Sequence, residues 1–229
     1  MELLHNGFTL DTPPGTFPLS TDSMVLSDFV RLPKNASVLD LGSGCGTLGL
    51  LLCARDPGCH ITGIELNPQS HLAALCNIER NALQTRMESI CADLRAFPNG
   101  VKDGFYTTCV SNPPYFTGGP ASAANSAARR DNTCSAEDLF AVASRALRFG
   151  SDFFLVHKPE KLALLCACAS RHQLEPKRLC LVRHRAGSEV TLILLQCRKG
   201  GKPGLIWEEM CLFDTTGSPT DHYQRIYHL

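Results

Sequence analysis

Short apolar runs alternate with longer amphipathic segments along residues 37–172, which is the pattern of strands followed by helices. The apolar runs that predict strands open the stretch 37–46 and recur at 60–66, 87–93, 104–112 and 151–158. The segments that predict helices lie at 47–56, 68–83, 135–150 and 159–172. Because a helix between two strands returns the chain to the same sheet, this alternation predicts βαβ units and a mainly parallel sheet.

Local signals mark the ends of two of these helices. The segment 68–83 begins with Pro68, a residue suited to the first helical turn. Its apolar positions, which predict the buried face, are 72, 75, 78 and 82. In the next predicted helix, Ser135 and Asp138 have the spacing of a capping box, and Gly150 predicts the helix end.

The last third of the chain predicts a change from parallel to antiparallel pairing. Residues 176–184 and 189–199 are apolar runs joined by a short polar turn, which predicts a hairpin. Together with the earlier runs they predict a doubly wound α/β fold, with a seven-stranded, mainly parallel sheet and an antiparallel edge strand. The segment 204–229 predicts an extra hairpin and a short closing helix.

In doubly wound sheets ligands bind beyond the carboxyl ends of the strands, so the residues that follow each strand form the candidate site. The first strand runs into DLGSGCG, where Gly42, Gly44 and Gly46 allow a tight turn and the close approach of a ligand. The dinucleotide fingerprint G-x-G-x-x-G is not met, because Thr47 holds the position of its third glycine. Asp40 disfavours a bound pyrophosphate and favours a ligand with a cationic centre, such as the sulfonium and amino groups of S-adenosylmethionine.

Acidic residues also follow the second and third predicted strands. Glu65 lies about twenty residues after the glycines, where a carboxylate can accept from both ribose hydroxyls of an adenosine. NAD and S-adenosylmethionine sites share this feature, so it does not separate them. Asp93 is placed to accept from an adenine amino group. Each acid alone could instead cap a helix or face solvent, and their joint position at strand ends is what predicts a site.

The fourth predicted strand ends in the sequence Asn112-Pro113-Pro114-Tyr115. An amino group on a conjugated ring is a poor nucleophile, because its lone pair is delocalised, and it needs acceptors that draw the nitrogen toward tetrahedral geometry. The Asn112 side-chain oxygen and the Pro113 carbonyl can supply two acceptors, since proline locks the φ angle. The Tyr115 ring offers a stacking platform for a flipped-out or single-stranded base. The alternative is a turn that only ends the strand.

The net charge is zero, but the charge is unevenly distributed. Residues 145–202 contain twelve lysines and arginines and four acidic residues, so this segment is either a phosphate-binding surface or an ordinary solvated face. The twelve cysteines form no C-x-x-C pair and lie mostly in apolar runs, which favours buried thiols over zinc or disulfides. The sequence contains no signal peptide and no membrane-spanning run. These features predict a cytoplasmic protein with neither a bound metal nor a membrane partner.

The strand-end motifs resemble those of class I S-adenosylmethionine-dependent amino-methyltransferases, which have a Rossmann-like fold. FPLSTDSMVLSDFV, VLDLGSGCGTLGLLL, ITGIELNPQS and VSNPPYF are similar to the bacterial tRNA adenine-N6 methyltransferases that act beside the anticodon of a valine tRNA. This similarity covers nearly the whole chain. It implies S-adenosylmethionine as the cofactor, tRNA as the partner, and N6 of the adenine at anticodon-loop position 37 as the methylated atom.

The resemblance also implies roles for individual residues. Those expected to contact the cofactor or the target amine are Asp40, Gly42, Gly44, Glu65, Asp93 and Asn112. Those expected to act in catalysis are Asn112, Pro113 and Tyr115. Those expected to hold the tRNA are Tyr115, Phe116, Arg129 and Arg130, the first two by stacking and the arginines through phosphates.

Two parts of the chain are expected. Residues 1–35 form an N-terminal leader that covers the cofactor site, with Thr21 and Asp22 folding over the cofactor. Residues 36–229 form the methyltransferase domain, with a C-terminal hairpin extension. The sequence does not predict the oligomeric state.

Other functions remain open at this point. Glutamine N5-methyltransferases of release factors also carry NPPY, but they place a helical substrate-binding domain before the glycine loop, and only about 36 residues precede the first strand here. Methylation of guanine N2 in RNA is a second enzymatic alternative. A cofactor-binding scaffold and a nicotinamide oxidoreductase are the alternatives from other classes.

Overall fold

The computed structural model describes residues 1–4, 7–113 and 134–227 of the 229-residue chain. The strands are β1 Glu2–Leu3, β2 Thr9–Leu10, β3 Ser37–Leu41, β4 His60–Glu65, β5 Met87–Cys91, β6 Tyr106–Ser111, β7 Leu147–His157, β8 Leu174–Arg185, β9 Val190–Lys199 and β10 Ile206–Phe213. The helices are α1 Thr21–Phe29, α2 Thr47–Arg55, α3 Pro68–Arg80, η2 Leu94–Ala96, α5 Ala136–Ala146, η3 Pro159–Lys161, α6 Leu162–Arg171 and α7 Asp221–Tyr227. Among the helices so described, none has the length and apolar character needed to cross a bilayer.

The predicted doubly wound α/β class is confirmed, and two details of the sheet are corrected. Within the described residues the main sheet has eight strands rather than seven, in the order β10-β8-β9-β7-β6-β3-β4-β5. The antiparallel strand β9 lies inside the sheet, between β7 and β8, and the edge strand β10 runs parallel to β8. The β8–β9 hairpin leaves one side of β8 unpaired, and β10 satisfies its backbone groups. As far as residue 227, the segment after 204 forms β10, a turn in which Phe213 and Pro219 make an antiparallel bridge, and the predicted helix α7. The expected extra hairpin is thus present only as this single bridge, without a second strand.

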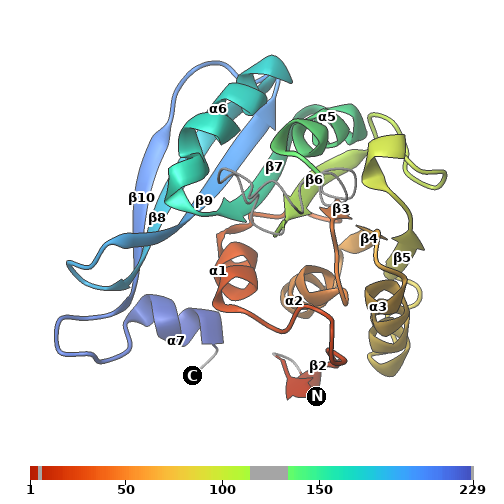
Figure 1. Cartoon of the computed structure of the whole chain (residues 1–229), viewed down its shortest axis with the longest axis horizontal. Coiled ribbons are helices and arrows are strands. Elements are labelled where there is room, and N and C mark those ends of the chain that lie inside the picture. Colours follow the sequence, from red (N-terminus) through yellow and green to blue (C-terminus); the bar gives the residue numbers. More distant parts are fainter. Residues whose placement is uncertain (5–6, 114–133, 228–229) are drawn as a thin grey trace, which may run out of the picture.

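Helices cover both faces of the sheet (Figure 1). Successive side chains of a strand point to opposite faces, so Phe154 of β7 joins the core that includes α1, α2 and α7, and Phe153 joins the core that includes α5 and α6. Burial on both sides explains why the strands read as almost continuous apolar runs. The buried cysteines, as expected for small apolar side chains, are those at 45, 53, 59, 109, 168, 180 and 197.

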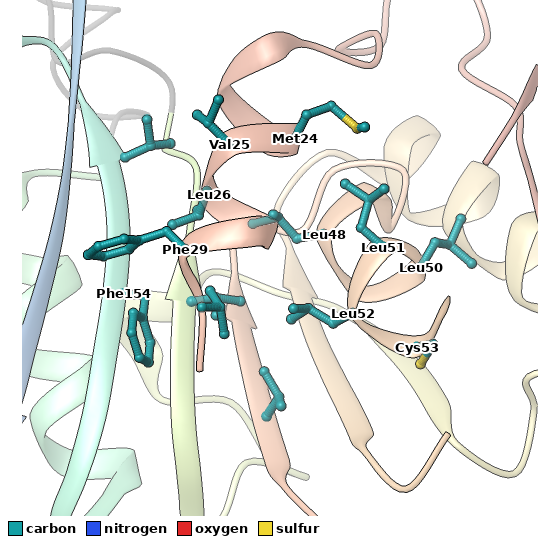
Figure 2. Close-up of a cluster of buried hydrophobic side chains, with 14 of the residues drawn as sticks. Met24, Val25, Leu26, Phe29, Leu48, Leu50, Leu51, Leu52, Cys53 and Phe154 are labelled. Carbon is teal, nitrogen blue, oxygen red and sulfur yellow. The ribbon is translucent and has the colours of Figure 1, made fainter. Parts of the chain in front are cut away.

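Helix α1 packs between the sheet and α7. Leu26 and Phe29 of α1 enter the core beside α2, as Figure 2 shows, and the ring of Phe29 meets that of Phe154 edge-on with 5.9 Å between centroids. Outside the core, the Arg225 guanidinium of α7 donates two hydrogen bonds of 2.8 Å to the Asp28 carboxylate. These contacts fix α1, which carries part of the N-terminal leader, against the sheet.

Of the four positions predicted to form the buried face of helix α3, Ile78 is buried and the other three are exposed. Leu72 and Leu75 are 61% and 41% exposed, whereas Asn77 is fully buried. The Asn77 amide donates to the carbonyls of Asp11 and Cys45, at 2.9 and 3.0 Å, and accepts from the Asp11 backbone N–H. The buried Asn77 side chain, whose amide is fully hydrogen-bonded, thus joins the N-terminal segment to the glycine loop. The need to keep these hydrogen bonds sets which face of the helix is buried more than the spacing of its leucines does.

The boundary between α5 and β7 also differs from the prediction. The capping box of Ser135 and Asp138 is confirmed, but α5 ends at Ala146 and β7 begins at once with Leu147. Leu147 is fully buried and pairs with Tyr106 of β6. Gly150 therefore lies within the strand, at φ +79°, and does not end the helix. Burial of Leu147 starts the strand three residues before the glycine that predicted the helix end.

Candidate active site

A cavity of about 720 Å³ lies at the carboxyl ends of β3, β4, β5 and β6. The predicted residues brought together in its lining are Asp40, Gly42, Gly44, Glu65, Asp93, Asn112 and Pro113. The N-terminal segment adds Gly15, Thr16, Phe17 and Ser23 to the same lining. Tyr115, Phe116, Arg129 and Arg130 lie outside the described residues. The strand ends that sequence reasoning selected therefore share one site.

The glycine loop after β3 is bent back onto β4. The backbone N–H groups of Gly42 and Ser43 both donate to the Ile64 carbonyl at 3.0 Å. Gly42 and Gly44 have φ of +75° and +56°, and a Cβ atom on either would have open space around it. Gly42 and Gly44 are needed for backbone conformation rather than to avoid a neighbouring side chain, so this part of the loop presents its backbone to the cavity.

The Glu65 carboxylate is held by the backbone on both sides. Its Oε2 accepts from Gly44 N–H at 2.8 Å, and its Oε1 accepts from Asn67 N–H at 2.7 Å. A carboxylate oxygen has more than one lone pair, so each oxygen can accept a further hydrogen bond from a ligand hydroxyl. Glu65 therefore offers a bidentate acceptor in a fixed orientation at the edge of the glycine loop.

Asp40 carries the unusual electrostatics of the site. Its side chain is 1% exposed, and neither carboxylate oxygen has a hydrogen-bond partner among the described residues. Burial, and secondarily the charge of Glu65, raises the pKa of Asp40 to about 7, against a weaker influence of the Gly49 backbone N–H, which lies outside hydrogen-bond geometry. A buried carboxyl group without a partner is costly, and a cation in the cavity would relieve that cost. The site fits a ligand with a positive centre.

The Asp93 carboxylate is less available to accept a hydrogen bond from a ligand than its position after β5 indicates. The Arg95 guanidinium donates to both Asp93 oxygens, to Oδ1 at 3.0 Å and to Oδ2 at 2.6 Å, and the backbone N–H of Arg95 donates to Oδ1. These hydrogen bonds lower the pKa of Asp93, and its side chain caps η2. An adenine amino group would have to share the carboxylate with Arg95.

Asn112 is oriented by a residue of the leader. Its Nδ2 donates to the buried Ser23 hydroxyl of α1 at 2.9 Å. The amide donor is engaged there, which leaves the Oδ1 acceptor on the other side of the amide group for a ligand donor. Pro113 follows directly and is buried. The contact with Ser23 therefore leaves Asn112 Oδ1 as a hydrogen-bond acceptor for the N–H of an amino group.

Sequence reasoning missed Ser23 and selected its neighbours. The Thr21 hydroxyl lies 3.3 Å from the Tyr227 hydroxyl of α7, and neither Thr21 nor Asp22 is among the described residues that line the cavity. Burial raises the pKa of Asp22, and the nearby Lys158 opposes this effect. The sequence did contain a signal that could have found Ser23. The side chain of Ser20 caps α1, and this places Ser23 one turn into the helix on its buried side.

The chain matches a family model described as methyltransferase small domain over residues 18–163. A tRNA1(Val) (adenine(37)-N6)-methyltransferase of Shewanella halifaxensis is 30% identical, with 76% of this chain and 70% of that protein covered. A protein of the same name from Bacteroides fragilis is 31% identical, with 74% and 72% covered. One from Aeromonas salmonicida is 28% identical, with 92% and 88% covered.

Solved structures show the same fold at lower sequence identity. A predicted O-methyltransferase from Agrobacterium tumefaciens has a TM-score of 0.76 and 20% identity, covering 91% of this chain and 96% of its own. Geranyl diphosphate C-methyltransferase from Streptomyces coelicolor, solved with S-adenosyl-L-homocysteine, has a TM-score of 0.59 and 12% identity, covering 77% and 76%. At these identities the likeness concerns the fold alone.

Proposed function

Because the chain belongs to the methyltransferase small domain family, we propose that it transfers a methyl group from S-adenosylmethionine to N6 of an adenine in tRNA. The adenine at anticodon-loop position 37 is the expected target, as the names of the relatives state for those proteins. One observation carries the proposal. A buried carboxyl group with no hydrogen-bond partner in the described part of the chain shares a cavity with an amide that presents its acceptor.

The cofactor proposal follows from what each wall of the cavity offers. S-adenosylmethionine, when bound, supplies a methyl group activated by a positively charged sulfur. The Asp40 carboxylate suits its cationic part, the Gly42–Gly44 backbone leaves space for it, and Glu65 suits the ribose hydroxyls. We infer that Asp93 acts on the adenine side mainly by holding Arg95 in place.

The target amine is the second ligand of the site. Asn112 Oδ1 and the Pro113 carbonyl would accept its two N–H groups and so restore lone-pair density on the nitrogen. Positioning and polarisation of this kind supply the catalysis, and after transfer the nitrogen passes one proton to solvent water. Tyr115 and Phe116 are proposed to stack on the base, and Arg129 and Arg130 to contact phosphates.

The domain organisation and location are proposed on similar grounds. Residues 1–35 act as a leader over the cofactor site, since Gly15, Thr16, Phe17 and Ser23 line the cavity. Residues 36–229 form the catalytic domain, whose C-terminal part is β10 and α7. We place the protein in the cytoplasm, where a tRNA substrate is found.

The direct test is methylation of tRNA by the purified protein with isotopically labelled S-adenosylmethionine, followed by mass spectrometry of nucleosides. N6-methyladenosine is the expected product. Label in N2-methylguanosine, or in a glutamine of a release factor, would replace the proposal by one of those alternatives. Binding of adenosylhomocysteine without transfer to any substrate would indicate a scaffold. A thermal shift produced by NAD and not by adenosylhomocysteine would indicate an oxidoreductase.

Replacing Ser23 by alanine is expected to lower the rate of methyl transfer about five- to tenfold, the effect of one lost hydrogen bond. The Asn112 amide would then rotate away from its productive orientation, while the dissociation constant of adenosylhomocysteine stays within about twofold, because Asn112 contacts the amine. Single-turnover rates and calorimetric titration measure the two quantities.

The matched control for this variant is Ser27→Ala. Ser27 lies one turn further along α1 and is buried to the same extent, 4% exposed, without a contact to Asn112. If the Ser27 and Ser23 variants lose the same activity, the helix matters only for its packing, and the orienting role of Ser23 is wrong.

A further inference from the structure

Helix α7 contacts α1 near both ends of α1. The Arg225 guanidinium donates two hydrogen bonds of 2.8 Å to the carboxylate of Asp28, the next-to-last residue of α1. The Tyr227 hydroxyl lies 3.3 Å from that of Thr21, the first residue of α1. In Figure 1 α7 lies below α1. At about 1.5 Å of rise per residue the two contacts are about 10 Å apart along α1, so together they oppose sliding and rotation of that helix.

Helix α7 is itself held in place by β10 and by the turn that follows β10. One Asp214 carboxylate oxygen accepts from two backbone N–H groups of the turn, at 2.8 and 2.9 Å. The ring of Tyr223 lies 4.8 Å from that of Phe213 and is stacked on that of Tyr227, at 4.4 Å between centroids. Ile226 is 3% exposed and belongs to the same core as α1. The groups that meet α1 are therefore attached to a well-packed element.

The part of α1 between these two contacts carries Ser23, whose hydroxyl accepts from Asn112 Nδ2 at 2.9 Å. Hydrogen bonds of this kind span about 2.7 to 3.2 Å, so a displacement of α1 by about half an ångström would take the pair out of that range. The orientation of the Asn112 amide therefore depends on how exactly α1 is placed.

Apolar packing alone does not supply that exactness. The buried side chains of α1 are mostly apolar, and the hydrophobic effect that buries them has no preferred direction. Hydrogen bonds are directional, and those at Thr21 and Asp28 reach α1 from α7. The contacts with α7 are thus suited to setting the position of a helix that the core has already buried.

We propose that Arg225 and Tyr227 are positioning residues for methyl transfer. Through Asp28 and Thr21 they hold α1 where the Ser23 hydroxyl can orient the Asn112 amide. This inference rests on the proposed function and gives the C-terminal segment a part in the same reaction. Because the effect passes through Ser23, removal of both side-chain contacts cannot lower the rate more than Ser23→Ala does.

The test is a double-mutant cycle between Arg225→Ala/Tyr227→Phe and Ser23→Ala, measured by single-turnover methylation of tRNA. In the wild-type background the α7 variant is expected to lower the rate about threefold to fivefold, with the dissociation constant of adenosylhomocysteine within about twofold. In the Ser23→Ala background the same substitutions should change the rate less than about 1.5-fold, because the hydrogen bond that they protect is already absent.

Two further variants keep the test independent of folding. Tyr227→Phe retains the stacked ring, and Arg225→Lys retains the charge and should recover part of the lost rate. Arg198→Ala is the matched control, because Arg198 donates two hydrogen bonds of 2.8 and 2.9 Å to Asp152. The side chains of that pair are 44% and 18% exposed, against 54% and 17% for Arg225 and Asp28. The control pair joins β9 to β7, and its loss should change the rate less than about 1.5-fold.

The outcomes separate this inference from the proposed function. Additive losses in the cycle, or a loss larger than that of Ser23→Ala, would show that α7 acts by another route and would overturn the inference. An equal loss in Arg198→Ala would assign the effect to general stability and would also overturn it.

If the wild-type protein methylates no tRNA, the proposed function fails, and the side-chain amide proton signals of Asn112 then decide the inference. These signals are assigned in NMR spectra of isotopically labelled protein by their loss in Asn112→Ala. The inference is supported if the α7 variant moves them toward their positions in Ser23→Ala and Arg198→Ala does not. It is rejected otherwise.

Discussion

Substitution of Asn112 by alanine is expected to lower kcat for methyl transfer by about 100-fold or more, the loss measured when a preorganised hydrogen-bonding group is removed from an active site. The target amine would lose the acceptor that Asn112 presents once its Nδ2 is engaged by Ser23. The dissociation constant of adenosylhomocysteine should change less than about threefold, because Asp40, the glycine loop and Glu65 remain. Single-turnover kinetics and calorimetry measure the two quantities.

Asn112→Asp is the informative companion of this variant. It keeps an acceptor oxygen of similar size but removes the Nδ2 donor, so the carboxylate can meet the Ser23 hydroxyl only as an acceptor and loses the original orientation. The kcat of Asn112→Asp for methyl transfer is expected to lie between those of the wild type and Asn112→Ala. If cofactor affinity and kcat fall together in the alanine variant, Asn112 belongs to the cofactor site, and its role as the acceptor for the amine is wrong.

Substitution of Asp40 by asparagine is expected to weaken binding of S-adenosylmethionine about 10- to 100-fold, the effect of removing a charged partner from a desolvated site. In the wild type, affinity should rise from about pH 6 to about pH 8, because the Asp40 pKa of about 7 means that the carboxyl group becomes charged across that range. In Asp40→Asn the pH dependence should flatten. Calorimetric titrations at several pH values measure both effects.

The same group affects stability in the opposite direction. The folded-state pKa of Asp40, about 7, lies above the ordinary aspartate value of 3.8, so the folded protein without ligand holds its proton more tightly than the unfolded chain does. Stability of the unliganded protein then falls as pH rises from about 4 to about 7, by at most about 1.4 kcal/mol per pH unit. Asp40→Asn lacks this loss. At about pH 8 the unliganded variant should therefore melt at a higher temperature than the wild type, although it binds the cofactor more weakly.

Asp93→Asn is the control for Asp40. Hydrogen bonds from Arg95 lower the pKa of Asp93, so this carboxylate stays charged at neutral pH and on either side of it. The variant should keep the rise of affinity with pH that Asp40→Asn loses. A flat profile in both variants, or a wild type whose affinity does not respond to pH, would contradict the assignment of Asp40 as the titrating cation partner.

Features predicted from the sequence succeed where the signal is local. The capping box at Ser135 and Asp138 and the strands that end before Gly42 and Asn112 are set by residues within a few positions of each other. The prediction failed where a distant contact competes with the local signal. Gly150 predicts a helix end, but burial of Leu147 against β6 starts the strand before it.

The same contrast applies to α3 and to the sheet edge. The leucines of α3 predict its buried face, yet the hydrogen bonds of Asn77 to Asp11 and Cys45 rotate the helix so that Leu72 is exposed. The pairing of β10 with β8 joins strands separated in the chain by the whole of β9, and it follows a hairpin that could have been extended on either side. No local pattern in residues 204–229 predicts which strand β10 will pair with.

By itself, the sequence determined the α/β class and the residues that stand at the carboxyl ends of four strands. These features depend on the spacing of apolar residues and on glycines and prolines, whose effects are confined to nearby positions in the chain. Only the tertiary structure decided which polar atoms there are still available. Asp40 has no hydrogen-bond partner in the described part of the chain, Asp93 is engaged by Arg95, and Asn112 is oriented by Ser23 from 89 positions earlier. Hydrogen-bond partners are chosen by packing in three dimensions, and distance along the chain does not encode that choice.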